Sequence, residues 1–260
     1  MVLARDLDLE DGRTLRVYDG GGRDAADAFT LVWLHGSPQT GIPLEPLLSA
    51  AARRGIRLLS YGRPSYGGSS PYPGRRVASA AADVAQVADA FGVSRFAVMG
   101  FSGGGPHALA GGALLAGRVT GVVSLAGLAP LTGDFDWFSG MVSDGALRAA
   151  VAGREARARY ADSAEFGADS FTAADWAALS GAWASVGEDA GLADAAGPDG
   201  EIDDDVASAG PWEFDVAPEL WLRPHDGHVS ILNACPLAMD RLKVKLEGHA
   251  VRPCYEFGYP

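Results

Sequence analysis

The residues best suited to chemistry in this chain lie in a glycine-rich segment, Gly-Phe-Ser-Gly-Gly, at positions 100–104. Ser102 follows an apolar run and precedes a stretch of small residues, so we expect it on a tight turn between a strand and a helix. Such a turn presents a serine for nucleophilic attack and needs small neighbours, which Gly100 and Gly104 supply. We predict that Ser102 is a nucleophile. The plainer interpretation is a glycine-rich turn with a bystander serine.

A base for this serine is predicted in the segment Asp-Gly-His at positions 226–228, just past the last predicted strand. A neutral imidazole at His228 could take the proton of Ser102 and return it to a leaving group. His225 is the local competitor, but it lies at the end of the strand. The two histidines have no cysteine partner nearby, so we expect no metal site.

Acyl transfer also needs two N–H donors directed at the oxyanion. One would be the backbone N–H of Gly103, directly after the nucleophile. The other is expected from His-Gly-Ser-Pro at 35–38, after an earlier apolar strand, and we assign it to Ser37. Pro38 cannot donate and helps to fix the turn. The alternative is a plain turn at the end of a strand.

The elements that must position these residues alternate along the first half of the chain. Residues 2–9 and 13–18 predict a hairpin. Apolar strands are then expected at 29–34, 56–60, 95–99 and 119–125, with helices at 44–54, 77–91 and 103–116. Strands that alternate with helices indicate a parallel sheet with right-handed crossovers, so the predicted fold class is α/β.

The alternation of strands and helices ends after Pro130. Residues 132–211 show helical patterns but no convincing strand, and we interpret them as a helical lid inserted into a core of residues 1–131 and 212–260. Strand character returns at 219–223.

Aromatic and acidic residues distinguish the lid. Trp137 and Trp183 are assigned to the apolar wall of a substrate pocket, and the alternative is packing of the lid onto the core. Glu201 and the run Asp203–Asp205 are interpreted as a solvated face rather than a metal site.

Composition narrows the classes of partner. The 260 residues carry a net charge of -12, which disfavours nucleic acids and anionic membranes as partners. The two cysteines indicate no disulfide framework, and we read neither a signal peptide nor an apolar stretch of the ~20 residues that a membrane helix needs. We expect a soluble cytoplasmic protein.

Taken together, the motifs resemble the α/β-hydrolase family, in its serine hydrolase branch with a helical lid. The resemblance covers residues 13–235 and rests on the segments at 35–38, 100–104 and 226–228, and on Tyr-Gly-Gly-Ser at 66–69. It implies an α/β-hydrolase fold, with a mostly parallel sheet flanked by helices. It also implies hydrolysis of a small, mostly apolar carboxylic ester or lactone through an acyl-enzyme, without a cofactor. The serine nucleophile argues against the dehalogenase and epoxide hydrolase branches.

The chain departs from the family where the triad acid belongs. The family has a strand, an acid-bearing turn and a helix between the lid and the last strand, but here residues 212–218 run directly into 219–222. We expect 219–222 to move into the vacated position. Asp136 is our candidate for the acid, and its alternative role is a helix N-cap.

Loss of the orienting acid costs about 10⁴ in turnover in other triads, so we expect weakened activity. The alternative is a degenerate α/β-hydrolase that only binds a small molecule or a partner. A third interpretation is a chain that lacks part of its fold and folds poorly. Oligomeric state does not follow from the sequence.

Overall fold

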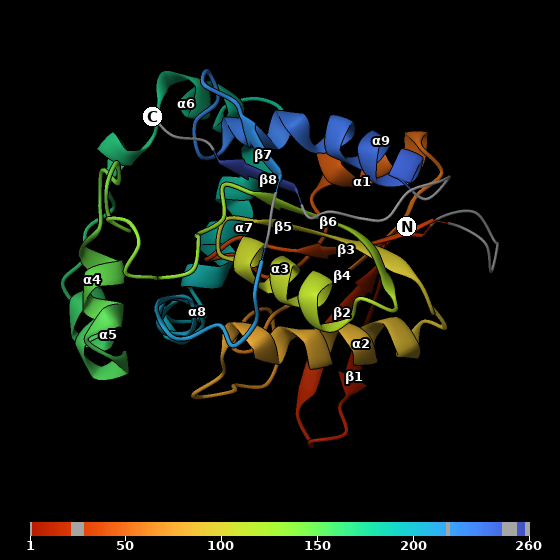
Figure 1. The fold of residues 1–260 in the computed structure, drawn as a ribbon, viewed down its shortest axis with the longest axis horizontal. Coiled ribbons are helices and arrows are strands. Elements are labelled where there is room, and N and C mark those ends of the chain that lie inside the picture. The colour runs from red at the N-terminus through yellow and green to blue at the C-terminus, as the bar shows by residue number, and fades with distance from the viewer. Residues whose placement is uncertain (1, 22–28, 217–218, 246–253, 258–260) are drawn as a thin grey trace.

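A single twisted sheet forms the centre of the molecule, with helices on both faces (Figure 1). The computed structural model describes residues 2–21, 29–216, 219–245 and 254–257. The strands are β1 Leu3–Asp8, β2 Thr14–Asp19, β3 Thr30–Leu34, β4 Arg57–Tyr61, β5 Phe96–Phe101, β6 Val119–Leu125, β7 Glu219–Leu222 and β8 Cys254–Phe257. Their order in the sheet is β1-β2-β4-β3-β5-β6-β8-β7. β2 is antiparallel to β1 and β4, and all the other neighbours are parallel.

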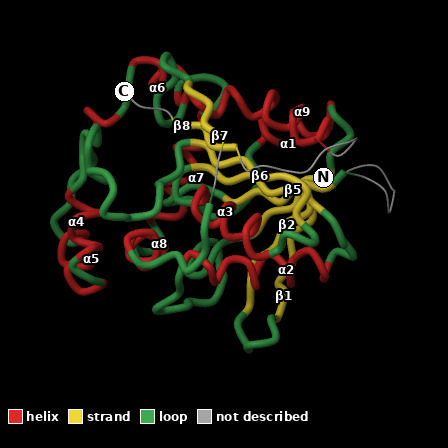
Figure 2. Tube along the Cα trace, viewed as in Figure 1, coloured by secondary structure: helices red, strands yellow, loops and turns green. Residues whose placement is uncertain are grey.

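The helices fall into two groups. Those that cover the sheet are α1 Glu45–Arg53, α2 Ala80–Ala90, α3 Gly104–Leu114 and α9 Cys235–Lys245, with the 3-10 turns η1 Val77–Ser79 and η3 Ser230–Ala234. Those between β6 and β7 are α4 Gly145–Val151, α5 Arg154–Ala161, α6 Ala173–Leu179, α7 Ala184–Asp194 and α8 Asp199–Ala209, with η2 Ala168–Ser170. Figure 2 shows α4 and α5 well away from the strands. Within the described ranges, no helix has both the length and the apolar character needed to span a membrane.

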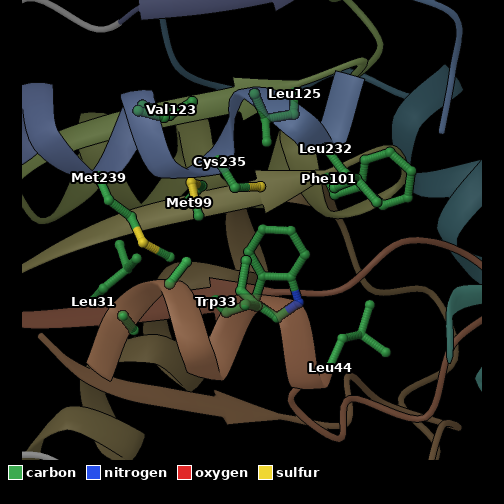
Figure 3. Close-up of a cluster of buried hydrophobic side chains, with 14 of the residues drawn as sticks. Leu31, Trp33, Leu44, Met99, Phe101, Val123, Leu125, Leu232, Cys235 and Met239 are labelled. Atoms are coloured by element: carbon green, nitrogen blue, oxygen red, sulfur yellow. The ribbon is translucent and has the colours of Figure 1, made fainter. Parts of the chain in front are cut away.

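The core lies on both faces of the sheet because successive strand residues point to opposite sides. Leu31 and Trp33 of β3 belong to one buried cluster, which packs against α1 and α9. Val32 and Leu34 belong to a second cluster, which packs against α2 and α3. Figure 3 shows the first cluster, in which side chains of β3, β5, β6 and α9 meet. These central strands are fully buried, which explains their uninterrupted apolar sequences.

The edge of the sheet differs from the expected arrangement. β7 does not take the position beside β6, because β8 pairs in parallel with both β6 and β7 and separates them. The prediction that residues 219–222 move next to β6 is therefore wrong. Residues 254–257 in the tail, for which we made no prediction, fill that position, and α9 lies between β7 and β8 in the chain.

Buried ion pairs attach α8 to the core. Asp204, only 1% exposed, contacts the guanidinium groups of Arg63 at 2.5 Å and Arg75 at 2.8 Å. Asp203, 4% exposed, contacts Arg75 at 3.2 Å. The interpretation of these two carboxylates as part of a solvated face is wrong, because arginines from loops of the core compensate their charges.

Candidate active site

Ser102 lies on a sharp turn between β5 and α3. Its φ is 51°, a left-handed conformation that a non-glycine residue adopts only where its surroundings enforce it. Its N–H donates to the carbonyl oxygen of Leu125 on β6, at 2.8 Å. A Cβ on Gly100 would lie 2.2 Å from the oxygen of Gly104, and a Cβ on Gly104 would lie 2.2 Å from the oxygen of Leu34. The turn can therefore form only with glycine at both positions.

His228 lies on the loop that follows β7, and its Nε2 is 2.9 Å from the Oγ of Ser102. The two residues are 126 positions apart in the chain. The ring packs against Phe101, with the ring centroids 5.4 Å apart. The protein atoms packed around the ring lower the pKa of His228, although part of the side chain is exposed to solvent, and the negative charge of Asp175 partly opposes that shift. The structure thus gives Ser102 an imidazole that is neutral near pH 7.

Ser37 and Gly103, the two predicted oxyanion donors, lie against each other. A Cβ on Gly103 would be 2.2 Å from Ser37 Oγ and 3.4 Å from its backbone nitrogen. The Ser37 hydroxyl donates to Asp204 at 2.6 Å and accepts from Arg63 at 2.8 Å, so the buried ion pairs also fix this loop. The backbone nitrogen of Ser37 thus lies beside Gly103, the residue that directly follows the nucleophile.

Asp175 is a carboxylate near the histidine that we did not predict from the sequence. It lies in the first turn of α6, fully buried, and accepts hydrogen bonds from the backbone N–H groups of Val229 and Ser230, directly after His228. Its one sequence signal is the capping box Thr-Ala-Ala-Asp that begins at Thr172. That signal predicts the start of a helix but says nothing about contact with a loop more than fifty residues away.

A cavity of about 340 Å³ opens beside His228. Its apolar wall consists of Phe135, Trp137, Met141, Val142 and Phe171, with Leu128 and Ala129. Asp175, Thr172 and Gly227 line it next to the histidine. The lining is mostly apolar with a few polar groups, as is typical of small-molecule sites.

Comparison with known proteins identifies the fold. A family model described as the alpha/beta hydrolase fold matches residues 30–180, more than half of the chain. The chain belongs to the α/β-hydrolase family. The predicted α/β-hydrolase fold class is thereby confirmed.

Solved structures of other α/β-hydrolases share the fold over nearly the whole chain. A hydrolase from Pseudomonas aeruginosa PA01 has a TM-score of 0.64 at 19% identity, over 99% of this chain and 90% of that one. An enol-lactonase from Burkholderia xenovorans LB400 has a TM-score of 0.60 at 18% identity, over 98% and 90%. The esterase EaEST from Exiguobacterium antarcticum has a TM-score of 0.59 at 18% identity, over 97% and 90%. No curated protein matches the chain.

Two of the predicted site residues lie elsewhere in this α/β-hydrolase. Asp136 is exposed, and its carboxylate accepts the N–H of Phe138 at 3.1 Å within a turn, so it is neither close to His228 nor the N-cap of a helix. Trp183 is buried in the core, where its Nε1 donates to Asn233 at 3.0 Å. Of the two tryptophans proposed for the pocket, Trp137 is the one that lines the cavity beside His228.

The other described histidines of this α/β-hydrolase do not meet the nucleophile. His35 is buried: its Nδ1 contacts the oxygen of Gly36 at 2.7 Å, and its Nε2 accepts the N–H of Arg63 at 3.0 Å. Burial lowers its pKa well below the usual value, so it stays neutral. His107 is buried beside Asp204 at 3.3 Å. Across the part of the chain that the structure describes, no group of three or more potential ligands could hold a metal ion.

Proposed function

We propose that the chain is a serine hydrolase that cleaves a small, mostly apolar carboxylic ester or lactone through an acyl-enzyme at Ser102. The observation that carries this proposal is the 2.9 Å contact between Ser102 Oγ and His228 Nε2, on a turn with a left-handed serine. The mostly apolar cavity supports an uncharged substrate of this class.

The proposed reaction follows from this arrangement. The Oγ of Ser102 attacks the carbonyl carbon while His228 takes its proton, and the N–H groups of Ser37 and Gly103 stabilise the oxyanion. Collapse of the intermediate breaks the C–O bond, and the imidazolium gives its proton to the departing alkoxide. Water, deprotonated by His228, then attacks the carbonyl carbon of the acyl-enzyme. The bond from that carbon to Ser102 Oγ breaks, the imidazolium returns its proton to Oγ, and the carboxylic acid leaves.

Labelling with a fluorophosphonate tests the proposal, because such a reagent phosphonylates only an activated serine. We expect mass spectrometry to find the label on Ser102, and Ser102→Ala to abolish both labelling and hydrolysis of short p-nitrophenyl esters. Ser139→Ala is the matched control, since Ser139 is an exposed lid serine outside the cavity wall. Folded wild-type protein without label at Ser102 would refute the proposal.

A second candidate function is binding without turnover. It is motivated by the contacts of His228: among the described side-chain hydrogen bonds of its ring, one reaches Ser102 and none reaches a carboxylate. A degenerate hydrolase of this kind would keep its affinity for a small apolar ligand in Ser102→Ala, while the wild-type protein would show no turnover of any ester tested.

A further inference from the structure

The carboxylate of Asp175 holds the backbone of the histidine loop (residues 226–230). Its Oδ1 accepts the N–H of Val229 at 2.8 Å and that of Ser230 at 2.7 Å. Both donors come from residues that directly follow the histidine. Charge-assisted hydrogen bonds of this kind are about twice as strong as neutral ones, so they fix the direction in which the loop leaves His228.

The other carboxylate oxygen anchors the lid side. Oδ2 of Asp175 accepts the N–H and the hydroxyl of Thr172, both at 2.9 Å, which closes the capping box of α6. Burial raises the pKa of Asp175, but the four hydrogen bonds outweigh burial and leave that pKa below its ordinary value. Asp175 is therefore an anion at neutral pH.

The carboxylate of Asp175 also packs closely against Gly227, the residue directly before His228. A Cβ on Gly227 would lie 2.1 Å from Oδ2 of Asp175. The carboxylate thus contacts the loop backbone both before and after His228. A larger residue at position 227 would force the loop and the carboxylate apart.

The charge of Asp175 also reaches the imidazole. Its negative charge favours the protonated ring and partly opposes the lowering of the pKa of His228. The nearby Arg223 and Asp226 pair with each other at 2.7 Å, and His225 is exposed to solvent. An anion here stabilises the imidazolium that forms when His228 takes the serine proton, which is one role of the acid in a catalytic triad.

We propose that Asp175 is the positioning residue of this site: from the lid, it holds the histidine loop and supplies the negative charge that the triad acid supplies elsewhere. The inference rests on the proposed serine mechanism. The proposed arrangement differs from a complete triad, in which the carboxylate binds the imidazole directly. The four described hydrogen bonds of the Asp175 carboxylate go to Thr172, Val229 and Ser230, so it acts on His228 through the loop backbone and through its charge. It also means that the site is complete only while α6 is docked on the histidine loop.

Asp175→Asn separates charge from shape, because the amide nearly matches the carboxylate in size. We expect fluorophosphonate labelling of Ser102 to slow by about tenfold or more. We also expect the pKa of His228, followed by NMR titration of its ring, to fall, because an anion that favours the imidazolium is gone. Asp169→Asn removes an exposed lid charge and is the matched control.

A purely structural role would lower the melting temperature without moving the pKa of His228, and that result would overturn the proposal. Labelling at the wild-type rate in folded Asp175→Asn would overturn it as well.

Should this variant fail to unfold cooperatively, Gly227→Ala tests the same contact with no change of charge, and we expect at least about tenfold slower labelling. Labelling of Gly227→Ala at the wild-type rate would also overturn the proposed role of Asp175. If wild-type protein never labels, the proposed function fails, while the NMR titration still reports whether Asp175 acts on His228.

Discussion

At the scale of single residues, the pKa of His228 decides when the site can react. The imidazole must be neutral to accept the proton of Ser102, and its Nε2 lies 2.9 Å from the Oγ of Ser102. Desolvation by the protein atoms packed around the ring lowers the pKa of the partly exposed His228 below the ordinary 6.5, and the charge of Asp175 opposes only part of that shift. The neutral form therefore persists to lower pH than for a histidine in water.

This predicts the acidic limb of the pH–rate profile. We expect kcat/KM for a short ester to rise with pH through a midpoint below 6.5 and to stay level through pH 8, because deprotonation of His228 is complete there. Steady-state rates between pH 4.5 and 8.5, with stability monitored at each pH, measure the midpoint. A midpoint above 6.5 would show that the histidine is not desolvated as described.

At the scale of elements, α8 connects the lid to the oxyanion loop. Asp204 on α8 contacts Arg63, Arg75 and the hydroxyl of Ser37, and all of the charged groups are buried. Burial raises the pKa of Asp204, but Arg63 and Arg75 more than compensate and hold it well below the usual value. The carboxylate is thus ionised in the folded protein at any pH near neutrality.

Removing this charge has a predictable cost. Asp204→Asn leaves two buried guanidinium groups without their shared counter-charge, and we expect a loss of about 3–5 kcal/mol in the free energy of unfolding. Because the folded pKa of Asp204 is depressed, its contribution is present above pH 4 and fades as the pH falls through the folded value, so the two proteins should converge in acid. Urea unfolding at pH 7 measures the loss of stability, and urea unfolding at a series of pH values below 3.8 follows the convergence.

Asp199→Asn is the matched control for Asp204→Asn, since Asp199 lies on the same helix with its side chain 70% exposed and its ion pair to Arg154 open to solvent. We expect it to change stability by less than about 1 kcal/mol. A similar small loss for Asp204→Asn would contradict the structural role assigned to the buried pairs.

At the scale of the whole molecule, β8 holds the far edge of the sheet together. Its residues Cys254–Phe257 pair with β6 on one side and β7 on the other, and β7 has no other strand partner among the described residues. The histidine loop leaves the end of β7, so the position of His228 depends on a strand that lies after it in the chain.

Ending the chain at residue 245 tests this dependence. Without β8, β7 loses its described pairing and β6 exposes an edge, so we expect a lower melting temperature and association through the exposed edge. We also expect slower fluorophosphonate labelling of Ser102, because β7, which leads into the loop of His228, no longer has its strand partner. Thermal unfolding and size-exclusion chromatography measure the outcome. A shortened chain with wild-type stability and labelling would contradict the role given to β8.

The sequence predicts what is local and misses what is long-range. The glycines around Ser102, the apolar strands and the helical spacing each reflect the residue and its near neighbours, and the structure agrees with them. The position of β8, the burial of Asp204 and the contact of Asp175 with Val229 depend on partners between 54 and 141 residues away. The spacing of residues in the sequence does not reveal those partners. From the sequence alone, Asp204 is typical of a solvated surface and Asp175 of a helix cap.

The order of the strands also bears on how the chain folds. β1 to β6 are complete by Leu125, and they can pair with one another as soon as that segment is available. β7 precedes its described partner in the sequence and must wait for α9 and β8 before it can join the sheet. Such non-local pairing is slow, because closing the loop between the strands costs conformational entropy before any stabilising contact forms. We expect the nucleophile to reach its final position early in folding and the histidine to reach it last.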